Sequence, residues 1–118
     1  MPNNTILDHF RNPRNAGNLE DATAIVEVTN PVCGDTMRLS VRIDKRRIVE
    51  ARFKAQGCVA SIAAGSMLTD LVSAKSIDEA REITAEQISD SLGGLPSASF
   101  HAAQLAIDAL IAALQRVA

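Results

Sequence analysis

The chain has 118 residues, of which 47% are hydrophobic and 22% are charged. This balance is ordinary for a globular protein, so we expect one domain spanning residues 1–118. Its only aromatic residues are three Phe, whereas base-stacking nucleic-acid modules depend on aromatic platforms. The net charge of −2 gives no sign of a polyanionic partner, and we expect no nucleic-acid binding.

The N-terminus lacks a basic start followed by an apolar run, and no apolar run approaches membrane-spanning length. We therefore expect a cytoplasmic protein with no membrane partner. The chain contains two cysteines, Cys33 and Cys58. In a reducing compartment such a pair serves metal binding or catalysis more often than a disulfide.

A short helix is predicted first. Asn4 or Thr5 can cap it, and Pro13 limits it because the residue before a proline avoids helical geometry. His9 lies in this helix, and we interpret it as a surface or partly packed side chain. Residues 12–21 are predicted to form a loop.

Three strands are predicted next. Residues 24–29 favour a strand, and the Asn-Pro pair that follows ends it. Residues 37–43 and 49–55 both alternate apolar and polar side chains around a short polar turn, which predicts an antiparallel hairpin. The three strands together would form a sheet with one buried face. The inward set predicted for the last strand is Val49, Ala51, Phe53 and Ala55.

The second half is predicted to be helical. Small side chains fill residues 59–72, which would let a helix lie close against the sheet. Ser76 and Thr84 each begin a capping-box pattern, so we expect two short helices there. A loop at residues 91–96 precedes a last helix from about Ser99 onward. Its predicted apolar stripe consists of Ala103, Ile107, Leu110, Ile111, Leu114 and Val117. Three strands followed by helices are typical of an α+β fold, with helices on one face of a three-stranded antiparallel sheet.

Candidate metal ligands lie at the ends of these elements. Cys58 follows Gly57 and falls at a helix start, where free N–H groups and the helix dipole favour a thiolate. Cys33 and Asp35 share a loop, and His101 lies near the start of the last helix. Two thiolates, an imidazole and a carboxylate would suit Zn²⁺ or iron in a tetrahedral site. The alternative is a buried Cys58 that only fills space at a strand–helix joint.

Five stretches of the sequence carry a family resemblance. They are LDHFRNPRN at 7–15, CGD at 33–35, ARFKAQGC at 51–58, SIDEA at 76–80 and LGGLP at 92–96. With them, the chain resembles the U-type iron–sulfur cluster assembly scaffolds, which comprise the IscU family and the N-terminal domain of NifU. The resemblance implies a SufE/IscU-like α+β architecture and a scaffold that is not an enzyme.

The resemblance also implies a site. In this family three cysteines bind a [2Fe–2S] cluster, iron or zinc, an aspartate tunes cluster lability, and a histidine beside the third cysteine can be a ligand. Cys33 and Cys58 match the first two cysteines, Asp35 matches the aspartate, and His101 matches the histidine. The implied partners are a cysteine desulfurase, as the sulfur donor, and apo iron–sulfur proteins, as acceptors.

Two positions depart from the family pattern. Ala102 stands where the third cysteine would follow the histidine, and an alanine cannot form the persulfide credited to that cysteine. After Leu95 and Pro96 the chain continues as Ser-Ala-Ser, in place of the Pro-Val-Lys that a dedicated Hsp70 partner recognises. We therefore do not expect that chaperone contact.

Three functions remain open on the sequence. The favoured one is a scaffold or carrier whose cluster, iron or zinc is held by Cys33, Asp35, Cys58 and His101; a homo-oligomer could supply further thiolates. The second is a divergent paralogue that docks on a desulfurase or another scaffold and builds nothing, as Ala102 suggests. The third is a thiol enzyme with Cys58 as nucleophile and His101 as base.

Overall fold

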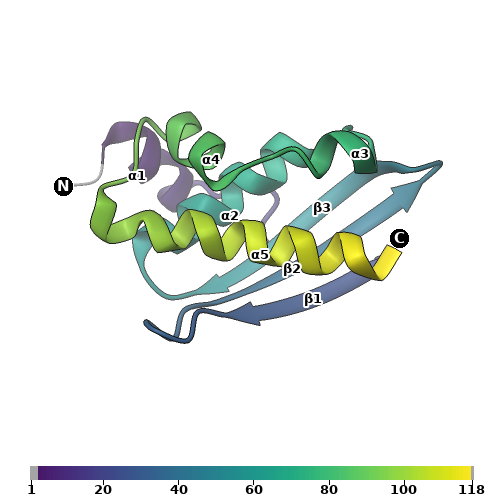
Figure 1. Cartoon of the computed structure of the whole chain (residues 1–118), viewed down its shortest axis with the longest axis horizontal. Coiled ribbons are helices and arrows are strands. Elements are labelled where there is room, and N and C mark those ends of the chain that lie inside the picture. Colours follow the sequence, from purple (N-terminus) through teal and green to yellow (C-terminus); the bar gives the residue numbers. More distant parts are fainter. Residues whose placement is uncertain (1–2, 118) are drawn as a thin grey trace.

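A three-stranded antiparallel sheet forms one layer of the protein, for which a computed structural model describes residues 3–117. The strands are β1 (Ala24–Thr29), β2 (Thr36–Asp44) and β3 (Arg47–Gln56), with β2 in the centre (Figure 1). Their register pairs Val26 with Leu39 and Leu39 with Phe53. The predicted hairpin and the predicted three-stranded sheet are confirmed.

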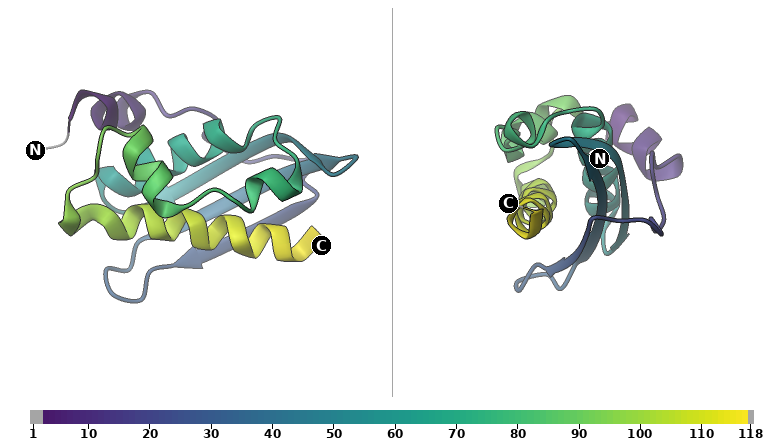
Figure 2. Two further views of the ribbon diagram at one scale, coloured as in Figure 1. Left: turned by 45° about the horizontal axis from the view of Figure 1, so that its top comes forward. Right: turned by 90° about the vertical axis from the view of Figure 1, so that its right-hand side faces the viewer.

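Helices cover one face of this sheet, as predicted, and the view along the molecule in Figure 2 shows the two layers. Helix α2 packs on β3, whereas α5 packs on β1 and β2, and the two helices touch each other. The shorter helix α1 lies beside α2, and α4 lies against α5. The helices are α1 (Asn4–Arg11), α2 (Val59–Val72), α3 (Ile77–Ala80), α4 (Ala85–Ser91) and α5 (Phe100–Val117), with a 3₁₀ turn η1 (Ser97–Ser99) before α5.

The core lies between the sheet and the two long helices. Met37, Leu39 and Val41 of β2 point into it and are fully buried. Helix α2 comes so close to the sheet that a Cβ at Gly65 would overlap the ring of Phe53. The small residues of α2 therefore have the role that the sequence predicted, because larger ones would push the helix away from β3.

The predicted inward set of β3 is wrong at the turn end of the hairpin. Val49 is 46% exposed, whereas its neighbour Ile48 is fully buried. Arg42 pairs with Glu50 but Ile43 pairs with Ile48, so Val49 is the extra residue of a β-bulge. A bulge shifts the in–out alternation of a strand by one residue. The alternation is therefore reversed only before the bulge, at Ile48, whereas Ala51 and Phe53 after it face inward as predicted.

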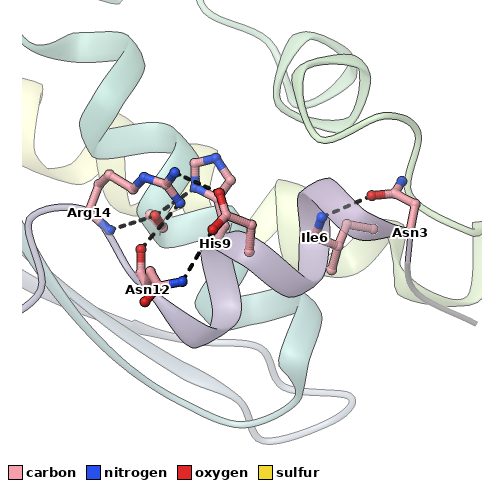
Figure 3. Close-up of polar contacts among 7 residues, drawn as sticks. Asn3, Ile6, His9, Asn12 and Arg14 are labelled. Carbon is pink, nitrogen blue, oxygen red and sulfur yellow. Dashed lines mark hydrogen bonds and ion pairs between the residues drawn. The ribbon is translucent and has the colours of Figure 1, made fainter.

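Helix α1 begins one residue earlier than predicted. The side chain of Asn3, instead of Asn4 or Thr5, caps it by accepting a hydrogen bond from the Ile6 N–H at 2.9 Å (Figure 3). His9 of this helix is more buried than expected, with 6% of its surface exposed.

His9 helps to fix α1 against α2. Its Nδ1 atom lies 2.7 Å from Oγ of Ser66, and the Arg14 backbone N–H donates to the same oxygen at 2.8 Å. The Arg14 guanidinium also pairs with Asp8 at 2.7 Å. These contacts give His9 a structural role, because they join α1 to α2.

The two predicted caps in the middle of the chain are present. Ser76 and Glu79 form a reciprocal capping box at α3, with hydrogen bonds of 2.9 and 3.1 Å. Thr84 caps α4 by accepting a hydrogen bond from the Gln87 N–H at 3.1 Å. Both short helices therefore begin where the sequence predicted.

The C-terminal helical segment corrects two expectations. By length and composition alone, Ser97–Val117 could cross a membrane, contrary to the prediction that no run approaches that length. Half of an apolar 18-residue window within this segment is buried, and α5 packs against the sheet, as the core helix of a folded domain does. Ile111 is 48% exposed at the flank of the apolar stripe, so its predicted place in the core is wrong.

Candidate metal centre

Three segments that are distant in sequence meet at one end of the molecule. They are the loop between β1 and β2, the joint between β3 and α2, and the start of α5 (Figures 1 and 2). The loop carries Cys33 and Asp35, the joint carries Cys58, and α5 carries His101. The fold thus brings all four predicted ligand residues to the same end.

Three of these residues form a compact group. One ligand atom from each of Cys33, Asp35 and His101 lies within 4.8 Å of the other two. Nε2 of His101 is 4.0 Å from Oδ2 of Asp35. The Cys33 thiol is exposed, the imidazole is about one-third exposed at 34%, and Asp35 is buried, so an ion could reach the group from solvent.

The loop that presents Cys33 is shaped by Asn30. Its Oδ1 accepts hydrogen bonds from the backbone N–H groups of Val32 at 2.9 Å and Cys33 at 3.3 Å. Its own backbone N–H donates to the Asp35 carbonyl at 2.8 Å. An Asn side chain that bonds the backbone two residues later is a known turn-former, so the sequence held this signal, although we had interpreted Asn30 only as a strand breaker.

Asp35 is held as a carboxylate. Its Oδ2 accepts a hydrogen bond from the Ser61 hydroxyl at 2.7 Å and another from the Cys58 backbone N–H at 3.3 Å. The Ser61 hydrogen bond is the main reason that the pKa of Asp35 is lowered, and the bonds from Cys58 and Cys33 act in the same direction. The group therefore offers an anionic oxygen ligand at neutral pH.

Gly57 makes room for this carboxylate. Its φ of +146° lies in a region that residues with a side chain rarely adopt. A Cβ at this position would lie 2.5 Å from both carboxylate oxygens of Asp35. The glycine that the sequence placed before Cys58 is thus required by the close approach of the loop to the helix start.

Cys58 lies beside the compact group but outside it. It is the N-cap residue of α2, as predicted, and its thiol is exposed. Its sulfur contacts the Ser61 hydroxyl at 3.5 Å. Within residues 3–117, the group of three close ligand atoms does not include this sulfur. An apolar cavity of about 410 Å³ opens next to Cys58, lined also by Ile6, Val59, Ala60, Leu95, Pro96 and Ser99.

His101 and Ala102 face different surroundings. Ala102 is fully buried, whereas the side chain of His101 remains partly exposed beside Asp35. The imidazole approaches the carboxylate, and the described residues show no hydrogen bond between His101 and Cys58. The nucleophile–base contact that a thiol enzyme would use is therefore not formed in the part of the chain described.

Among known donor sets, thiol, imidazole and carboxylate groups together suit zinc or iron, whereas calcium and magnesium prefer oxygen ligands alone. Fold and site together define a class: small α+β proteins with thiol, carboxylate and imidazole side chains gathered at one end of a three-stranded sheet.

The family model of the NifU-like N-terminal domain matches residues 1–117, and the chain belongs to this family. The chain is 44% identical over 110 residues to iron–sulfur cluster assembly scaffold protein IscU 1 of Archaeoglobus fulgidus, covering 93% of this chain and 72% of that protein. It is 40% identical over 113 residues to the IscU scaffold protein of Escherichia coli, covering 92% and 88%.

A solved structure shows the same fold. The NifU-like N-terminal protein of Brucella abortus superposes with a TM-score of 0.76, covering 98% of this chain and 92% of that chain at 19% identity. The predicted family and the predicted architecture are both confirmed.

Proposed function

We propose that this protein is an iron–sulfur cluster assembly scaffold that holds iron or a [2Fe–2S] cluster through Cys33, Asp35, Cys58 and His101. The observation that carries the proposal is the group of three donor atoms within 4.8 Å of one another. Zinc is a further ion that this donor set suits. The names of the scaffold relatives support the same function.

Each residue has a separate role in the proposal. Cys33 would supply a thiolate from an exposed loop, His101 an imidazole from α5, and Cys58 a second thiolate from the helix start. Asp35 supplies an oxygen ligand, which is a poorer partner than a thiolate for iron–sulfur units and so favours release. A labile site is what a protein that passes its cluster on requires.

The proposed partners follow from this role. A cysteine desulfurase would supply sulfur and apo iron–sulfur proteins would accept the cluster, in the cytoplasm, where the two free thiols stay reduced. A homo-oligomer that shares one cluster between protomers would add thiolates to the two that each chain holds. Light scattering on the cluster-loaded protein should then report a species larger than the monomer.

Single substitutions of the ligand residues test the site. Zinc and ferrous iron binding are measured under anaerobic conditions for Cys33→Ser, Cys58→Ser and Asp35→Ala, and we expect the cysteine variants to lose binding. Asp108→Ala is the matched control for the carboxylate, because Asp108 lies on α5 and bonds only Gln104 among the described residues. Unchanged metal affinity in Cys33→Ser and Cys58→Ser would refute the proposed site.

A second candidate function rests on Ala102, which is buried and has no thiol to accept sulfur. In this alternative the protein docks on a desulfurase or another scaffold but assembles no cluster. A pull-down with a desulfurase, together with a metal assay, separates the two. Docking without any metal binding would favour the alternative, whereas metal binding that depends on Cys33 would favour the scaffold.

A further inference from the structure

We propose that Ser61 is a positioning residue of the metal centre: by donating its hydroxyl to Asp35 it holds that carboxylate, beside Cys58, in the arrangement that receives the ion. This inference rests on the proposed metal-binding function and goes beyond it, because Ser61 is not among the ligands. Its Oγ lies 2.7 Å from Oδ2 of Asp35 and 3.5 Å from Sγ of Cys58.

Ser61 ties the carboxylate of Asp35 to the start of α2, where the pairing of Thr36 with Gln56 and the Cys58 N–H already bring the loop close. Asp35 comes from the loop before β2, and Cys58 from the end of the connection after β3, 23 residues further along the chain. Ser61 is completely buried, so its hydroxyl cannot exchange these contacts for water without the site opening. A buried hydroxyl that loses its partner is destabilising, which fixes the side chain in place.

The start of α2 shows how the arrangement is built. Its N-cap residue, Cys58, makes no side-chain capping bond. Instead, the carboxylate of Asp35 accepts the Cys58 N–H and so caps the helix from a distant loop. A carboxylate at a helix N-terminus is favoured by the helix dipole. Ser61, one turn into the helix, completes the cap by donating its hydroxyl to the same carboxylate oxygen.

The consequence for metal binding is preorganisation. Groups that hydrogen-bond metal ligands orient them, and removing such a group typically weakens metal affinity about 10–100-fold. Ser61 holds the carboxylate beside Cys33 and His101 before an ion arrives. Without the hydroxyl, Asp35 would keep the weaker 3.3 Å bond from the Cys58 N–H but could rotate away from the other ligands.

A buried serine on the same helix provides a matched control. Ser66 is also completely buried in α2, but its hydroxyl contacts His9 and the Arg14 backbone, both labelled in Figure 3, and neither of these is a proposed ligand. Ser61→Ala and Ser66→Ala remove the same atom from the same helix. A general loss of packing would affect both variants alike, whereas a positioning role predicts that only Ser61→Ala weakens metal binding.

The experiment titrates the apo protein with Co²⁺ alone and follows the visible d–d bands, which report coordination geometry, and the near-ultraviolet charge-transfer band, which reports thiolate ligation. We expect Ser61→Ala to bind Co²⁺ about 10–100-fold more weakly than the unmodified chain. Ser66→Ala should stay within about threefold of it, since it touches no ligand. Circular dichroism on each variant verifies the fold independently of the metal.

A double-mutant cycle identifies the residue through which Ser61 acts. If it acts mainly on Asp35, Ser61→Ala should weaken binding by less than about threefold when Asp35 is already alanine. Equal effects in both backgrounds, equal effects of Ser61→Ala and Ser66→Ala, or unchanged binding in Ser61→Ala would each overturn the inference. If the Ser61 inference fails but Cys33→Ser still loses Co²⁺ binding, the proposed metal-binding function stands. If Cys33→Ser binds Co²⁺ as the unmodified chain does, the proposed metal site itself is wrong.

Discussion

Gly57→Ala is the substitution that the geometry of the site forbids most directly. Two costs combine at this position. The new side chain must accept a φ of +146°, and its Cβ would lie 2.5 Å from both oxygens of the Asp35 carboxylate. The carboxylate would have to move, and its 2.7 Å hydrogen bond from Ser61 would be lost.

The size of the effect follows from these two costs. A residue with a side chain held in such a sparsely populated backbone conformation costs about 1–3 kcal/mol. A hydrogen bond to a charged group contributes about 1.5–3 kcal/mol to stability. We therefore expect Gly57→Ala to lower the free energy of unfolding of the apo protein by about 2.5–6 kcal/mol. Metal affinity should fall as well, because Asp35 is displaced.

Gly17→Ala separates the two costs. Gly17 has a similar φ of +125°, but a Cβ there would have no neighbour within 4 Å. Gly17→Ala should therefore lose only the backbone contribution, about 1–3 kcal/mol, and retain full metal affinity. Urea denaturation at neutral pH measures both variants against the unmodified chain. If the two glycines cost the same, or if Gly57→Ala binds metal normally, the close packing of Asp35 against the helix start is refuted.

Three further predictions concern the hairpin and two of the ionisable groups whose pKa is shifted, His9 and Asp35. Because the bulge turns Ile48 inward, Ile48→Ala should lower the free energy of unfolding by about 2–5 kcal/mol and Val49→Ala by less than about 0.5 kcal/mol, as measured by urea denaturation. A larger loss for Val49→Ala would mean that Val49, and not Ile48, faces the core. Burial lowers the pKa of His9 below its ordinary 6.5, so the unfolded chain binds more protons and stability should fall as the pH drops below about 6.5. His9→Gln should flatten that pH dependence, and an unchanged profile would contradict it. The Ser61 hydrogen bond lowers the pKa of Asp35, so the stability that the Asp35 carboxylate contributes is present above pH 3.8 and is lost as the pH falls through the lowered pKa. Asp35→Asn should lose this acid dependence of stability in the metal-free protein. An acid unfolding transition identical to that of the unmodified chain would contradict the assignment.

Most of the fold could be predicted because its signals are local. The alternation in β2 and the small residues of α2 define a strand face and a close-packed helix without reference to the rest of the chain. The capping patterns at Ser76 and Thr84 are likewise contained within four residues. Such features depend on neighbouring side chains and backbone, so the sequence alone is enough to place them.

The errors arose where the structure depends on contacts between distant residues. The bulge at Val49 follows from how β3 pairs with β2, and periodicity along one strand does not contain that information. Ile111 fits the helical stripe of α5 but is 48% exposed, and the periodicity of one helix does not show which of its positions other elements cover. The buried position of His9 depends on Ser66, which is 57 residues away.

The site was predicted only in part, because residue types can be read from the sequence but contacts between distant residues cannot. Residue types with metal chemistry are few, so Cys33, Asp35, Cys58 and His101 could be chosen from the sequence, and the fold brings three of them within 4.8 Å. Ser61 was missed because a serine in the first turn of a helix is common. Only the approach of Asp35 from another loop gives it a special role. The complete ligand set stays a prediction.

The most direct test of the scaffold function is the metal and acid-labile sulfide content of the protein purified without oxygen, together with its visible absorption spectrum. The account predicts iron and sulfide in equal amounts with a cluster spectrum, and their loss in Cys33→Ser and Cys58→Ser. Zinc or iron without sulfide would leave a metal site that does not assemble clusters. A protein that binds neither iron nor sulfide, even after both are supplied with a desulfurase, would contradict the account.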